Sequence, residues 1–197
     1  MQTLDLSQNN LESAIIAAVC DVLLDVTSLQ SLKLSKNRIG RMATQSLSAL
    51  AQCQSLQDLQ LGMCEMGDRG VAAVCASLEN MRSLKILDLK ANKIDAAGGA
   101  SLSTALSNMP SLESLDVSHN NHLGDEGASS LSTALLNMSS LKSLFLSYNS
   151  IGRKGIAPLS AALSNMPSLE SLDVSHNELG DIGVESLSAI LSNIPTL

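Results

Sequence analysis

Histidine and cysteine are the residues of this chain best suited to metal binding or nucleophilic chemistry. The histidines are His119, His122 and His176, and the cysteines are Cys20, Cys53, Cys64 and Cys75. No two cysteines form a CxxC pair, and no histidine stands at zinc-finger spacing from them. We therefore predict no metal site, no cofactor and no catalytic residue. We expect four reduced, mostly buried thiols, as is usual in a cytoplasmic protein.

Aromatic side chains are rare, and their positions suggest binding rather than catalysis. The chain has one Phe, Phe145, and one Tyr, Tyr148. Acidic and imidazole side chains recur at intervals of 28 or 29 residues around them: Asp88, Asp116, Asp173, His119 and His176. Aromatic anchors with a charged rim are typical of protein interfaces. We predict a partner-binding site from these seven residues; the alternative is that both aromatics are ordinary hydrophobic residues of a strand.

These intervals belong to a repeat that runs through the chain. An aliphatic residue, two others, Leu-x-Leu and then Asn or Cys recur in the pattern LxxLxLxx(N/C)xL. The steps between successive openings are 28, 27, 28, 28, 29 and 28 residues, and a further 28 leads to the final residue. The openings are Met1, Leu29, Leu56, Leu84, Leu112, Leu141 and Leu169, with Leu197 beginning an eighth repeat.

Each repeat contains the signals of one strand and one helix. The x-Leu-x-Leu segment predicts a short strand with its leucines inward and the intervening residues outward. The Asn that follows predicts side-chain hydrogen bonds to backbone groups of the turn. The second half predicts a helix, as in residues 125–137, with Asp125 as N-cap and Asn137 as left-handed C-cap. Asn-x-Pro stops other helices, at Asn108, Asn165 and Asn193, and glycines recur near the helix starts: Gly70, Gly99, Gly127, Gly155 and Gly183.

Stacked repeats of this kind must curve. Strands stack about 4.8 Å apart, whereas packed helices need about 8–10 Å. The strands therefore line the concave face of an open α/β horseshoe. In this arrangement Phe145 should lie between Asp116 and Asp173, and Tyr148 between the two flanking histidines.

The repeat motifs resemble the ribonuclease-inhibitor-like leucine-rich repeats over the whole chain. The resemblance implies a single α/β solenoid domain, residues 1–197, that forms a right-handed horseshoe of about seven 28-residue repeats. Runs such as LFLSYNSIGRKGIAPLSAALSNMPSL look most like the C-terminal repeats of nucleotide-binding, leucine-rich-repeat (NLR-type) innate immune receptors, where such repeats sense ligands or hold the receptor inactive. The alternative is a freestanding inhibitor or enzyme regulator, like ribonuclease inhibitor or a Ran GTPase-activating protein.

Composition narrows the partners. The net charge of −7 disfavours nucleic acid, which needs basic phosphate contacts. No apolar run is long enough to insert in a membrane. We expect a protein ligand, one that carries a basic patch if it meets the predicted acidic rim. Neither end has the polar cap of a terminal repeat, so we expect a fragment of a longer chain that self-associates through its ends.

Overall fold

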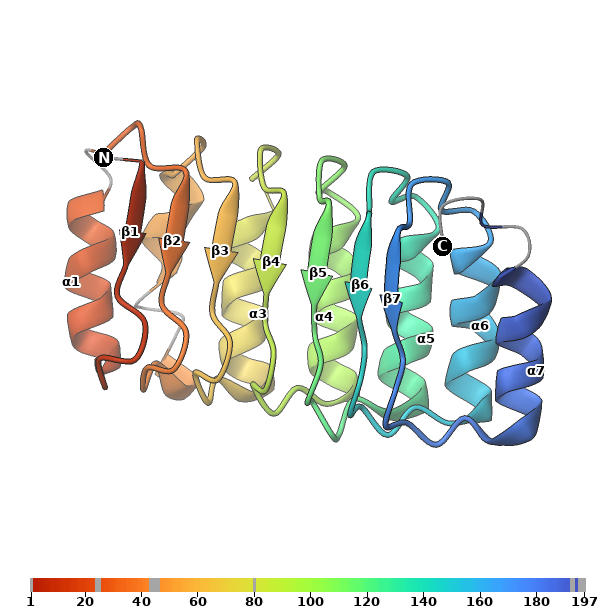
Figure 1. The fold of residues 1–197 in the computed structure, drawn as a ribbon. Coiled ribbons are helices and arrows are strands. Elements are labelled where there is room, and N and C mark those ends of the chain that lie inside the picture. The colour runs from red at the N-terminus through yellow and green to blue at the C-terminus, as the bar shows by residue number, and fades with distance from the viewer. Residues whose placement is uncertain (1, 24–25, 43–46, 80, 192–193, 195–197) are drawn as a thin grey trace.

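Seven parallel strands alternate with helices along the chain (Figure 1). The structure, a computed structural model, describes all residues except 1, 24–25, 43–46, 80, 192–193 and 195–197. Met1, Asn193 and Leu197, to which the sequence assigned the first repeat opening, a helix stop and an eighth repeat, lie outside the described residues. The strands pair in chain order as one open sheet: β1 (Thr3–Asp5), β2 (Ser31–Lys33), β3 (Asp58–Gln60), β4 (Ile86–Asp88), β5 (Ser114–Asp116), β6 (Ser143–Phe145) and β7 (Ser171–Asp173).

The strand register has the spacing of the repeat. The central leucines of neighbouring strands pair directly, from Leu4 with Leu32 to Leu144 with Leu172. Leu32 pairs with Leu59 and Leu115 with Leu144, so the shortened and lengthened repeats keep the same register as the others. A one-residue slip would turn every inward leucine outward, which explains why the register follows the leucine pattern.

A helical segment follows each strand on the outer side of the sheet. The α-helices are α1 (Ser13–Leu23), α3 (Gly67–Leu78), α4 (Ala96–Leu106), α5 (Gly124–Leu135), α6 (Arg153–Leu163) and α7 (Gly180–Leu191). In the second repeat the described residues instead form two 3₁₀ helices, η1 (Gly40–Met42) and η2 (Ser48–Gln52). This repeat is one residue shorter. A 3₁₀ helix advances about 2.0 Å per residue against about 1.5 Å in an α-helix, so fewer residues span the same distance.

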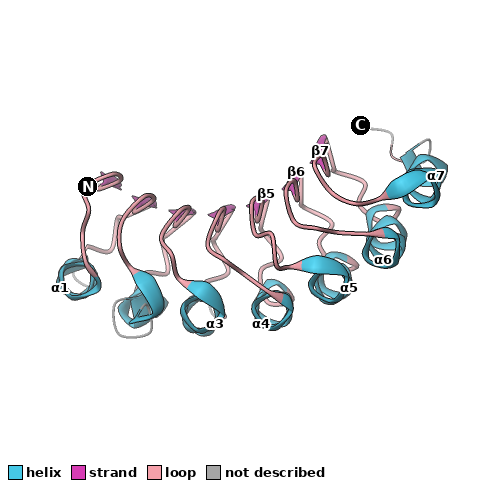
Figure 2. Cartoon of the chain, turned by 90° about the horizontal axis from the view of Figure 1, so that it is seen from below, coloured by secondary structure: helices cyan, strands magenta, loops and turns pink. Residues whose placement is uncertain are grey.

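The repeats form a curved stack with the strands on its inner side and the helices on its outer side (Figure 2). The leucines of the central strands are fully buried between these two layers: Leu32, Leu59, Leu87, Leu115 and Leu144. The residues on either side of each central leucine keep at least partial exposure. The strands therefore present one continuous row of accessible side chains per strand position to the concave face.

Buried asparagines connect each coil to the one before it. Asn92, Asn120 and Asn149 are fully buried. The Oδ1 of Asn149 accepts a hydrogen bond from the backbone N–H of Asn120 at 2.9 Å, and the Oδ1 of Asn120 accepts one from Asn92 at 2.8 Å. In the third repeat the Cys64 thiol contacts the carbonyl oxygen of Leu34 at 3.4 Å in place of an amide. The predicted role of the asparagines in satisfying turn backbone groups is confirmed.

Two predictions about helix ends are wrong. The carboxylate of Asp125 does not cap its own helix; its Oδ1 accepts hydrogen bonds from the backbone N–H groups of Gly152 (2.7 Å) and Gly155 (2.8 Å) in the next repeat. Asn137 does not adopt a left-handed conformation. Its N–H donates to the Ala134 carbonyl, three residues back, so the helix ends in a tightened turn that needs no positive φ.

One glycine of the predicted column was also misassigned. A side chain at Gly155 would meet the backbone of Asp125, in the previous repeat, at 2.9 Å. Gly98, and not Gly99, faces the previous repeat in this way, because a side chain there would meet Asp68 at 2.6 Å. A side chain at Gly99 would instead meet Leu123 of the following repeat. The two adjacent glycines thus allow close contact on both sides of α4.

Candidate functional site

The predicted binding residues of repeats 5–7 come together on the concave face. Strand register places Phe145 of β6 directly between Asp116 of β5 and Asp173 of β7. The Phe145 side chain is partly exposed. Because these residues alternate with inward leucines, the same pattern that builds the core directs them outward.

Tyr148 lies in a stack of three rings. Its ring centroid is 4.3 Å from that of His119 and 4.0 Å from that of His176, with interplanar angles of 14° and 12°. Tyr148 is 39% exposed, so the edge of the stack is open to a partner. We call Phe145, Tyr148, His119 and His176 the aromatic patch; its flanking carboxylates are Asp116 and Asp173.

Backbone conformation explains how the stack forms. His119, Tyr148 and His176 have positive φ values of 59°, 56° and 53°. A left-handed conformation costs a non-glycine residue about 1–2 kcal/mol, and here it ends each strand and turns the side chain to the surface. The asparagine that follows each of these residues holds the turn through hydrogen bonds to the neighbouring coil. The buried asparagines therefore position the exposed rings.

The carboxylates at this strand position differ in their electrostatics. Burial raises the pKa of Asp88, and the nearby charge of Asp116 adds to the effect. For Asp173 burial also acts to raise the pKa, but hydrogen bonds from Ser175 and Ser147 outweigh it and the pKa is lowered. Asp116 accepts hydrogen bonds from both the backbone N–H and the hydroxyl of Ser118, at 2.9 and 2.6 Å. The patch therefore has anionic groups held at defined positions.

Of the predicted residues, Asp88 is the farthest from the patch. It lies on β4 beside Asp116 and is separated from Phe145 by one strand. Sequence reasoning did not assign roles to Ser147 and Ser175, which orient Asp173. Their place one residue before the ring positions in repeats 6 and 7 is the signal that identifies them.

The cysteines and His122 do not contribute to this site. All four cysteines are buried and free, as predicted. Burial raises the pKa of Cys20 to about 12, that of Cys64 to about 11 and that of Cys75 to about 12, so their thiols stay protonated at neutral pH and are poor nucleophiles. His122 pairs with Asp95 in a loop bridge. The described part of the chain contains no group of three or more His, Cys, Asp or Glu residues that could hold a metal ion.

Comparison with known proteins identifies the repeat. A family model described as a leucine-rich repeat matches residues 52–75, 80–103, 108–132, 137–160 and 165–188. The chain belongs to the leucine-rich repeat family. No curated protein matches it in sequence.

Leucine-rich repeats are generally non-catalytic scaffolds for protein–protein interaction, and the open sheet with its exposed concave face fits this use. The five matched segments begin 28 or 29 residues apart, at the spacing of the strand register. None of the helices in the described ranges has the length and apolar character needed to span a lipid bilayer. The family thus supports an interaction module, and the aromatic patch is the strongest candidate for its contact surface.

Proposed function

We propose that this chain is a non-catalytic recognition module that binds a protein ligand at the aromatic patch. The observation that carries the proposal is the arrangement of repeat 6: the only Phe and the only Tyr of the chain lie on the concave face, each between two polar side chains of the neighbouring repeats. Aromatic residues contribute much of the binding energy in protein interfaces, and the polar groups around them set orientation and specificity.

The flanking carboxylates favour a ligand with a basic side chain. Asp116 and Asp173 lie one strand to either side of Phe145, and Asp88 lies one strand beyond Asp116. A lysine or arginine beside an exposed apolar side chain would match this arrangement of an apolar centre with an acidic rim. The excess of acidic over basic residues in the chain supports a protein ligand rather than nucleic acid.

The module is proposed to be the sensor or autoinhibitory part of an NLR-like innate immune receptor in the cytoplasm. The sequence resemblance of the repeats supports this role, and the four free, buried cysteines fit a reducing compartment. The second candidate is a freestanding inhibitor or enzyme regulator, which the same concave surface would serve. The complete open reading frame distinguishes them: a nucleotide-binding domain encoded upstream supports the receptor, and a transcript that encodes only repeats supports the inhibitor.

Affinity measurements on patch variants test the binding site. After the ligand is captured by pull-down, titration calorimetry should show that Phe145→Ala or Tyr148→Ala weakens binding by roughly 2 kcal/mol or more. Gln30→Ala, an exposed change on the same face in repeat 2, serves as the control and should change the affinity little. Unchanged affinity for both aromatic variants, with loss of binding on changes to the outer helices, would place the site on the convex face.

Self-association is proposed to occur through α1. Ile15 and Val22 on this helix are 54% and 69% exposed, and they line an apolar hollow together with Leu4, Val19 and Val26. Burial of such a surface against a second copy is favourable by about 25 cal/mol per Å² of apolar area. Sedimentation at increasing protein concentration measures this association directly.

A further inference from the structure

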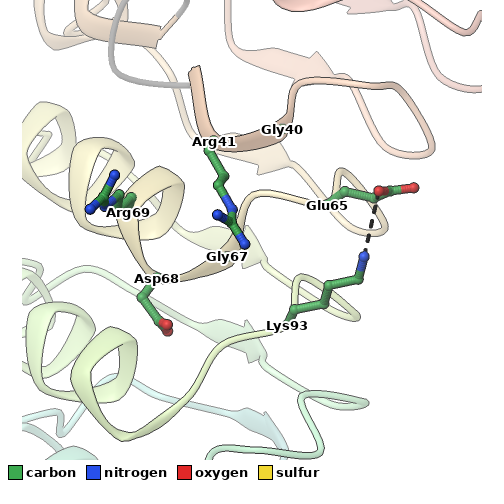
Figure 3. A pocket seen from close by; sticks show the side chains of 7 residues that line it. All are labelled: Gly40, Arg41, Glu65, Gly67, Asp68, Arg69 and Lys93. Carbon is green, nitrogen blue, oxygen red and sulfur yellow. Dashed lines mark hydrogen bonds and ion pairs between the residues drawn. The ribbon is translucent and has the colours of Figure 1, made fainter.

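A charged hollow lies at a different part of the solenoid from the aromatic patch. Its volume is about 620 Å³, and it lies at the edge where the loops after the strands of repeats 2–4 lead into the outer helical segments. The residues that line it are Gly40, Arg41, Glu65, Gly67, Asp68, Arg69 and Lys93 (Figure 3). We call this hollow the basic pocket, because three of its five charged side chains are cationic.

Both acidic side chains of the basic pocket already have partners. The Oδ1 of Asp68 accepts a hydrogen bond from the backbone N–H of Asp95 at 2.8 Å. The Oε2 of Glu65 lies 3.5 Å from the Nζ of Lys93, and both side chains are 68% exposed. Such an exposed pair is weak, so Lys93 can turn to another anion at little cost.

The guanidinium groups of Arg41 and Arg69 have no anionic partner within the described ranges of the chain. Figure 3 shows the Arg41 side chain extending from η1 toward Gly67, at the start of α3. In repeats 3 and 5 the residue at the position of Arg41 is an aspartate, Asp68 or Asp125, whose carboxylate accepts hydrogen bonds from backbone N–H groups of the next repeat. Arg41 places a cation where these repeats place an anion.

The start of α3 is therefore left without an acidic side chain from the preceding repeat. No side chain caps this helix, and its first backbone N–H groups carry partial positive charge. Lys93 approaches the same space from the following repeat. Positive charge thus comes from three successive repeats.

The charge distribution along the chain agrees with this local excess. Residues 29–111 contain 9 Lys and Arg against 6 Asp and Glu, a net charge of +3. Residues 112–197 contain 3 against 9, a net charge of −6. A chain whose total charge repels anions therefore has one region that attracts them.

We propose that the basic pocket binds an oxyanion, carboxylate or phosphate, on an acidic peptide segment of a protein. The fork of N–H donors on Arg41 contacts the anion, since a guanidinium matches the planar geometry of a carboxylate and the oxygens of a phosphate. Lys93 exchanges Glu65 for the bound anion. This site takes a ligand of opposite charge to the one proposed for the aromatic patch, so the two surfaces can bind different regions of one protein or two separate proteins.

Fluorescence anisotropy with defined peptides tests the proposal. The probes are three labelled octapeptides: one of glutamates, one with two phosphoserines in a neutral sequence, and one neutral. We expect at least one acidic probe to bind about tenfold more tightly than the neutral probe in low salt, with the preference falling as salt screens the charges. The stronger of the two acidic probes identifies carboxylate or phosphate as the preferred anion. If neither acidic probe binds better than the neutral one, the proposal is wrong.

Variants distinguish the basic pocket from a general effect of charge. Arg41→Gln should weaken the acidic probe about tenfold, and Lys93→Gln should weaken it less. Arg153→Gln is the matched control, because the pair Gly152-Arg153 occupies in repeat 6 the position of Gly40-Arg41 in repeat 2. An equal loss for Arg153→Gln would refute the assignment to this pocket. Tyr148→Ala should leave acidic-peptide binding intact, so failure of the patch and failure of the pocket give different results.

Discussion

Replacing Asn149 by Ala tests the link between buried asparagines and the repeat stack. Asn149 is fully buried and makes three hydrogen bonds: its Oδ1 accepts from Asn120, and its Nδ2 donates to the carbonyls of Val117 (3.1 Å) and Leu146 (3.0 Å). Alanine removes all three. The cost depends on which of the former partners is left without another hydrogen bond.

The two carbonyl oxygens keep a partner in the variant. The Nδ2 of Asn120 also donates to Val117 at 2.8 Å, and the Nδ2 of Asn177 also donates to Leu146 at 2.9 Å. The backbone N–H of Asn120 loses its acceptor. One unsatisfied buried group costs about 1–3 kcal/mol, so we expect the free energy of unfolding to fall by that amount.

Urea denaturation followed by far-UV circular dichroism measures this loss, since the chain has no Trp and only one Tyr for fluorescence. Lys142→Ala is the control. Its ammonium group lies 2.6 Å from Glu113, but the side chain is 47% exposed, and such surface pairs contribute about 0–1 kcal/mol. Equal losses for the two variants would show that the asparagine does not hold the coils together as argued.

Three further variants test the electrostatics, the packing and the exposed end helix. A raised pKa means that ionisation disfavours the folded state, so Asp88→Asn should raise stability at neutral pH, with the gain disappearing as pH falls below the ordinary carboxyl range; Asp173, whose pKa is lowered, should show a loss that also disappears in acid. Denaturation midpoints at several pH values check both signs, and the same sign for the two would contradict the assignment. Gly155→Ala should destabilise by about 1–3 kcal/mol, because the new Cβ would overlap the Asp125 backbone; a gain in melting temperature, as helix propensity alone predicts, would count against the packing argument. Val22→Lys should reduce concentration-dependent association in sedimentation, and a monomeric wild type at high concentration would rule out the α1 contact.

The sequence by itself determined the solenoid, its register and the neighbours of each strand residue. Period and pattern suffice for this, because each coil repeats the same strand and must bury the same leucines against the coil beside it. Hence Phe145 could be placed between Asp116 and Asp173 from spacing alone.

Only the tertiary structure decided how side chains cross from one repeat to the next. Asp125 caps the helix after its own, and Gly98 rather than Gly99 meets the preceding coil. The close stacking of Tyr148 with two histidines and the hollow beside Arg41 likewise depend on side-chain directions in three dimensions. A repeat pattern specifies which residues are adjacent, but it does not specify which donor meets which acceptor. That choice depends on backbone angles and on distances between coils that the linear sequence does not contain.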